Sequence, residues 1–162
     1  MEFKNLSNRE LLTLAKEKSK DDRAATLVVI NIIREVENRR LHLELGYGSL
    51  FEYVTKELGF DESAANRRIT AARLTRQIPA IEDKLAEGKL TLSNLVQAQV
   101  FFNREAKLKN QKVTLEEKRE ILGLIENKSK REAEKVLLAK SPEQATLKVS
   151  RRLTRHYFCK SA

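Results

Sequence analysis

The sequence is poor in the residues that end or bend helices, and it contains no tryptophan. Among its 162 residues are two prolines and five glycines, whereas leucine, alanine, glutamate, lysine and arginine are abundant. Proline and glycine disfavour helix most strongly, and the abundant residues favour it. We therefore expect a chain that is helical over almost all of its length.

The shortage of cysteine and histidine limits the chemistry that this chain can perform. A single cysteine, Cys159, excludes an intrachain disulfide and a zinc site made of several cysteines. The two histidines, His42 and His156, offer neither a metal-ligand set nor a Ser-His-Asp triad. A glycine-rich phosphate loop is also lacking. We expect no cofactor, no metal and no enzymatic activity.

Long hydrophobic runs are missing as well. The longest aliphatic run, Leu27 to Ile30, is far shorter than a membrane span. The first residues, MEFKNLSNRE, contain no apolar signal core. Because 41% of the residues are hydrophobic, the chain is also too apolar to be disordered. We expect a cytoplasmic protein without membrane contact, with association with the nucleoid as one form of that location.

Positive charge is in excess. The formal net charge is +9 and the isoelectric point about 9.7. Such a charge favours polyanionic partners, DNA and RNA among them, although a soluble protein can also be basic without binding either.

Helix boundaries are marked by capping patterns. Ser or Thr followed three residues later by Glu, the capping box, occurs at Ser7, Ser49, Thr114 and Ser129. With glycine stops and a proline start, these patterns predict helices over residues 7–18, 21–45, 49–58, 61–76, 79–88, 91 or 93–102, 114–127 and 129–140. Residues 103–112 are predicted as a loop or a frayed helix end. We expect an all-α, irregular bundle of about eight helices over residues 1–141.

Residues 142–162 are expected to form a basic tail that is flexible or contains a short strand at 146–150. From Ala145 onward the chain contains five Lys or Arg residues and no acid. Arg151, Arg152 and Arg155 could contact phosphate there, whereas a disordered end is the plainer interpretation.

Residues 50–76 match a helix-turn-helix, in which two short helices are joined by a short turn that often contains glycine. Gly59 is placed for a left-handed turn conformation. Apolar residues fall where the two helices should meet: Val54, Leu58, Phe60, Ala65 and Ile69. The helix over residues 61–76 would then be the recognition helix.

The outward face of that helix carries side chains suited to DNA. Arg can bind guanine and Asn can bind adenine in the major groove. We predict base contacts from Ser63, Asn66, Arg67 and Thr70, and backbone contacts from Arg68, Arg73 and Arg76. Arg68 occupies a usually apolar position, and two acids, Asp61 and Glu62, open the helix. Two amphipathic helices meeting at a glycine, with their arginines in water, are the alternative.

An ordered series of short segments carries a family resemblance. The segments are residues 39–41, 46–53, 58–59, 64–69, 71–73, 79–81, 88–93 and 128–134. The series resembles the helical N-terminal region of bacterial HNH endonuclease-like proteins. Residues 79–93 are more weakly similar to the helix-turn-helix region of ParB-type partition proteins. Both resemblances imply a role on DNA.

The departure from the HNH pattern is equally informative. In those proteins a nuclease module with His, Asn and a divalent metal follows, and neither histidine of this chain lies in such a set. We therefore predict a non-enzymatic protein that binds double-stranded DNA, with a homodimer as a further expectation because recognition helices are often delivered in pairs. The alternatives are a protein-interaction module or a truncated HNH endonuclease relative whose helical region docks a partner.

Overall fold

A computed structural model of the chain describes residues 3–141 and Glu143. Throughout these residues the regular structure is helical and contains no strand, which confirms the predicted all-α class. The chain divides into two compact units, residues 1–92 and residues 93–162, and each is described by itself. The predicted helical domain over residues 1–141 therefore comprises two units.

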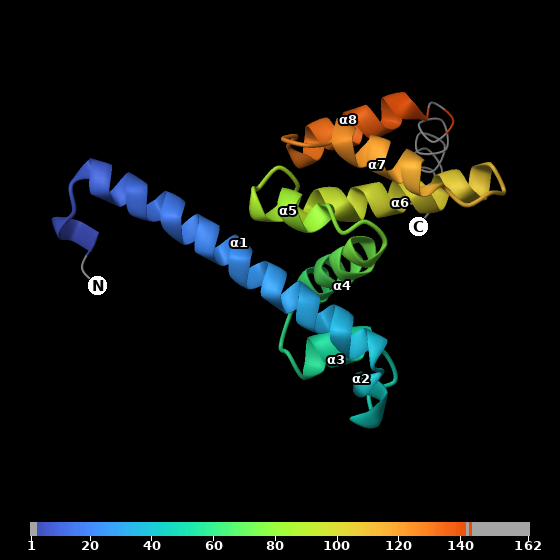
Figure 1. Cartoon of the computed structure of the whole chain (residues 1–162), viewed down its shortest axis with the longest axis horizontal. Coiled ribbons are helices and arrows are strands. Elements are labelled where there is room, and N and C mark those ends of the chain that lie inside the picture. The colour runs from blue at the N-terminus through green and yellow to red at the C-terminus, as the bar shows by residue number, and fades with distance from the viewer. Residues whose placement is uncertain (1–2, 142, 144–162) are drawn as a thin grey trace, which may run out of the picture. The chain divides into compact units, whose positions relative to one another are not determined.

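The first unit holds η1 and α1 to α5, and the second holds α6, from its second residue, to α8 (Figure 1). The bounds of the elements are η1 Phe3–Asn5, α1 Asn8–Asn38, α2 Leu41–Glu44, α3 Leu50–Lys56, α4 Glu62–Gln77, α5 Ile81–Ala86, α6 Leu92–Leu108, α7 Leu115–Leu124 and α8 Lys130–Lys140.

Three of the four predicted capping boxes are present in full. Ser7, Thr114 and Ser129 each accept a hydrogen bond from a backbone N–H while the Glu three residues on accepts one in return. The fourth differs, because Ser49 accepts from the Glu52 N–H but the Glu52 carboxylate accepts from the N–H of Gly48. These side chains satisfy amide groups that would otherwise lack partners at the first turn.

The predicted break between residues 18 and 21 is wrong, since α1 continues through it as a helix of 31 residues. Ser and Asp weaken a helix only slightly, and no glycine or proline interrupts this stretch. Lys18 also pairs with Asp21 at 2.9 Å, and the Ser19 hydroxyl donates to the Ala15 carbonyl at 2.7 Å without interrupting the helix.

The predicted extension of this helix to residue 45 is also wrong. The helix ends at Asn38, and Arg40 adopts a left-handed conformation with φ of 58° before the short α2 begins. A non-glycine residue with positive φ is uncommon, so local residue preference does not indicate this corner. The corner places His42 in a buried position.

Helix α6 is longer than predicted, because it continues past Phe102 to Leu108. The polar residues predicted as a loop or a frayed helix end are mostly good helix formers. Glu105 is buried and pairs with Lys109 at 3.0 Å. Asn110, with φ of 49°, follows the end of the helix.

The core of the first unit forms where α1 packs against α4 and α5 and where α3 packs against α4. Ile30, Ile33 and Val36 are the buried residues of α1. In the second unit α7 packs against α8, and Phe101 and Phe102 of α6 are buried. The predicted strand at 146–150 and the basic tail lie outside the described residues.

Candidate nucleic-acid interface

The predicted helix-turn-helix corner is built from α3, a five-residue connection and α4. Gly59 has φ of 70°, which confirms the left-handed conformation expected of this glycine. The Phe60 N–H donates to the Val54 carbonyl at 3.3 Å, which closes the turn over the end of α3. Asp61 begins α4, because its carboxylate accepts the Ala64 N–H at 2.9 Å.

The contact between the two helices is apolar. Val54 of α3 and Ala65 and Ile69 of α4 are buried, as expected for the positions where such helices meet. Phe60 is half-buried. Leu58 departs from the prediction, since 37% of it is exposed, and it therefore contributes little to this contact.

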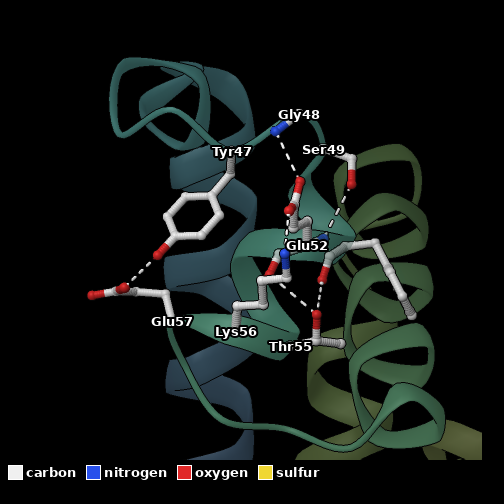
Figure 2. A network of polar contacts seen from close by, with 8 residues as sticks. Tyr47, Gly48, Ser49, Glu52, Thr55, Lys56 and Glu57 are labelled. Carbon is white, nitrogen blue, oxygen red and sulfur yellow. Dashed lines mark hydrogen bonds and ion pairs between the residues drawn. The ribbon is translucent and has the colours of Figure 1, made fainter.

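The entry to α3 is held by a carboxylate (Figure 2). Glu52 accepts the Gly48 N–H at 3.0 Å and pairs with Lys56 at 2.7 Å. The bond from Lys56, and after it the bond from Gly48, lowers the pKa of Glu52. The same carboxylate therefore joins the loop before α3 to the last residue of the helix.

Two tyrosines hold this loop from the other side. The Tyr47 hydroxyl donates to the Glu57 carboxylate at 2.5 Å, and that bond raises the pKa of Tyr47 (Figure 2). The Tyr47 and Tyr53 rings meet edge to face at 5.6 Å. The two tyrosines therefore pack beside the glycine turn, and together the contacts fix both ends of α3.

The first two turns of α4 present the predicted base-contacting residues. Ser63 and Asn66 are exposed, and Arg67 and Thr70 are half-buried. The Arg67 guanidinium donates to the Ser63 hydroxyl at 2.7 Å, one helical turn earlier. Within the described part of the chain, no carboxylate forms an ion pair with Arg67. This arginine therefore keeps its full charge close to the surface.

Arg68 lies differently from the predicted backbone contact. Its guanidinium carbon stands 4.2 Å from the centre of the Phe60 ring, and one guanidinium nitrogen donates to the Ala64 carbonyl at 3.4 Å. The Nε atom is buried without a hydrogen-bond partner. Burial, followed by the charge of Arg67, lowers the pKa of Arg68. The guanidinium of Arg68 thus packs on the Phe60 ring at a position where the motif usually has an apolar residue.

Arg73 and Arg76 are bound by side chains of α1. Arg73 donates to one carboxylate oxygen of Glu37 through Nε at 2.9 Å and through Nη2 at 2.7 Å. Arg76 donates to the Asn38 amide oxygen at 3.2 Å. Sequence analysis did not identify Glu37 or Asn38, because they lie 36 and 38 residues away and no local pattern connects them.

The remaining predicted contacts, Arg151, Arg152 and Arg155, lie outside the described residues. Across residues 3–141 and Glu143, no group of three or more His, Cys, Asp or Glu side chains is placed to hold a metal ion. Among the same residues no helix is both long enough and apolar enough to cross a membrane.

Comparisons with known proteins add no relative. No protein-family model matches the chain, and no match is found among curated proteins or among solved structures. The resemblances to HNH endonuclease-like and ParB-type proteins therefore stay predictions that rest on the segments quoted above.

Proposed function

We propose that this protein is a non-enzymatic DNA-binding protein that inserts α4 into the major groove of double-stranded DNA. The observation that carries the proposal is the outward face of α4, which follows a glycine-containing connection of five residues. Ser63, Asn66 and Arg67 lie on that face in the first two turns, where recognition helices contact base edges.

The chemistry of this face suits direct reading of bases. A guanidinium can donate two hydrogen bonds to guanine, and an Asn side chain can donate and accept with adenine. The partner of Arg67 is the neutral Ser63 hydroxyl, so no ion pair must break before Arg67 binds a base or a phosphate. The excess positive charge of the chain draws DNA toward it at low salt.

The other arginines of α4 contribute less to this proposal. Arg73 forms an ion pair with Glu37, and the guanidinium of Arg68 lies over the Phe60 ring. A phosphate contact from either side chain would have to replace one of these interactions. We therefore assign the main electrostatic contribution of α4 to Arg67, with Arg73 and Arg76 as secondary backbone contacts.

A salt titration tests the proposal. Fluorescence anisotropy of a labelled duplex is measured with the wild-type protein, with Arg67→Ala and with Arg119→Ala. Arg119 is an exposed arginine of α7, so the control removes the same charge at a distance from α4 in the sequence. Loss of one phosphate contact reduces the slope of log affinity against log salt by about 0.9. We expect that reduction, or a loss of base discrimination, for Arg67→Ala and neither for Arg119→Ala.

The outcomes of this titration show whether DNA binds to α4 or to another surface of the protein. If the wild-type protein does not bind the duplex at low salt, the proposal is refuted. If Arg67→Ala and Arg119→Ala bind equally well, DNA contacts a surface other than α4. A second variant, Asn66→Ala, should relax the preference for one base pair by roughly 1–3 kcal/mol and leave the salt slope unchanged.

The second candidate function is a protein-interaction module. A truncated HNH relative whose helical region docks a partner is one form of this candidate. Four large apolar residues beside the corner are exposed: Leu43, Leu45, Phe51 and Leu58. An interaction module would lose its partner on Phe51→Glu and keep it on Arg67→Ala. A DNA-binding protein should respond in the opposite way.

A further inference from the structure

The N-terminal half of α1 lacks a packing partner within its own unit. From Asn8 to Asp22 every residue is exposed except Leu14, which is half-buried, and this part of the helix runs beyond α2 to α5 (Figure 1). Isolated helices of about 12–15 residues are only marginally stable in water, because tertiary packing supplies most helical stability. We therefore expect another helical surface to pack against this half of α1.

A stripe with heptad spacing runs along the exposed side of α1. Its positions alternate in steps of three and four residues, the spacing of a coiled-coil seam. They are Leu11, Leu14, Lys18, Asp21, Ala25, Val28 and Ile32. Val28 is 58% exposed and Ile32 is 53% exposed, although aliphatic side chains in the long helix of a folded unit usually face its core. The buried residues of α1, Ile30 and Ile33 among them, are not part of this stripe.

We propose that the part of this stripe from Leu11 to Val28 is the interface with a second copy of the chain, and that the two α1 helices pair antiparallel. In the register that sets Lys18 of one copy opposite Asp21 of the other, Leu11 comes opposite Val28 and Leu14 comes opposite Ala25. Each contact occurs twice about a two-fold axis, as a self-complementary interface requires. The proposal is independent of DNA binding.

Charge selects the antiparallel orientation. A parallel pair would set Lys18 against Lys18 and Asp21 against Asp21, which is repulsive, whereas the antiparallel pair makes two ion pairs at its centre. In the single chain Lys18 and Asp21 pair with each other at 2.9 Å and remain about 60% exposed, so both are accessible to a partner. A charged layer within an apolar seam is a recognised way to specify coiled-coil register.

The flanking positions agree with this register. In an antiparallel coil, Ala15 lies beside Asp22 of the other copy, and Glu17 lies beside Ala24. Each of these pairs joins an alanine to an acid, so no like charges meet next to the central layer.

Sedimentation equilibrium of the full chain tests the interface. The wild-type protein should be a dimer that dissociates on dilution. Leu11→Glu should raise the dissociation constant at least tenfold, whereas Leu12→Glu should not, because Leu12 is 65% exposed and lies one residue off the stripe. Circular dichroism checks that both variants stay helical. A monomeric wild-type protein at its highest soluble concentration, or equal effects of the two variants, would overturn the proposal.

Charge exchange tests the register. Lys18→Glu alone should weaken the dimer at least tenfold, since an acid would then face Asp21, and Lys18→Glu/Asp21→Lys should restore it. If the double variant stays as weak as the single one, the proposed register is wrong.

Spin labels attached to Asn8→Cys in a Cys159→Ser background, one on each copy, test whether the two α1 helices pair antiparallel. With a rise of 1.5 Å per residue, the two labels should lie about 35 Å apart in the antiparallel pair and near 10 Å in a parallel one. The shorter distance would overturn the antiparallel assignment.

Discussion

Replacing Gly59 with alanine should destabilise the first unit through the backbone alone. A Cβ atom at Gly59 would meet nothing within 4 Å, so the substitution creates no clash. The φ of 70° is the unfavourable feature, and a left-handed conformation costs a non-glycine residue about 1–2 kcal/mol. Alanine also restricts the unfolded chain, which offsets about 0.4–1 kcal/mol of that cost. The expected net loss in the free energy of unfolding is roughly 0–1.6 kcal/mol, with a middle value near 0.8 kcal/mol.

Gly123 provides a matched control of opposite sign. It lies within α7, has no positive φ, and a Cβ atom there would also meet nothing within 4 Å. Because glycine is a poor helix former, Gly123→Ala should stabilise the second unit by at most about 0.5–1 kcal/mol, since Gly123 is the second-last residue of α7.

Urea denaturation followed by circular dichroism measures both effects, each variant being compared with the wild-type protein. Gly59→Asn provides a further check, since asparagine tolerates the left-handed region better than alanine and should lose less stability. If Gly59→Ala were stabilising, the left-handed turn that defines the helix-turn-helix corner would be refuted. If Gly123→Ala were destabilising, the helical assignment at its position would be wrong.

Three further predictions concern caps, ion pairs and pH. Ser49→Ala removes the acceptor for the Glu52 N–H and should cost about 1 kcal/mol in urea denaturation, whereas Ser19→Ala, in mid-helix, should be neutral or stabilising. Arg73→Ala removes both bonds to Glu37 and should lower the free energy of unfolding by about 0.5–1 kcal/mol. It should change the salt slope of DNA binding less than Arg67→Ala does. A larger change in that slope for Arg73→Ala would contradict the assigned roles. The bonds from Ser129 lower the pKa of Glu132 below 4.5, so its contribution to stability is complete above that pH and is lost as the pH falls through the lowered pKa. Unfolding measured across that range should be less pH-dependent in Glu132→Gln, and an unchanged profile would contradict this account.

Helix starts were the most predictable part of the fold. A cap is made within four residues, so Ser7, Thr114 and Ser129 could be identified from the sequence and are confirmed. The corner at Gly59 was predictable for the same reason, because glycine there allows the positive φ that the turn requires.

Helix ends without glycine were not predictable. Arg40 carries the positive φ after α1, and Asn110 does so after α6, although neither residue is followed by glycine or proline. The sequence offered no stop signal at Arg40, and Asn110, a residue that tolerates the left-handed region, was not recognised as one. The lengths of both helices were therefore predicted incorrectly.

The candidate site depends both on local sequence and on contacts between residues far apart in the chain. The outward position of Asn66 follows from helical spacing and the cap at Asp61, which are local properties. By contrast, the partner of Arg73 is an α1 carboxylate, and Arg68 covers Phe60 across the turn. Side chains with the same charge on one helix thus have different environments, which spacing alone cannot distinguish.

The all-helical class, the capped helix starts and the glycine corner followed from local residue preferences and hydrogen bonds between near neighbours. The course of α1 and the charge left available on each arginine of α4 were decided by tertiary packing. That packing joins residues more than 30 positions apart, such as Glu37 and Arg73. The spacing of residues along the sequence does not indicate which distant segments will contact each other.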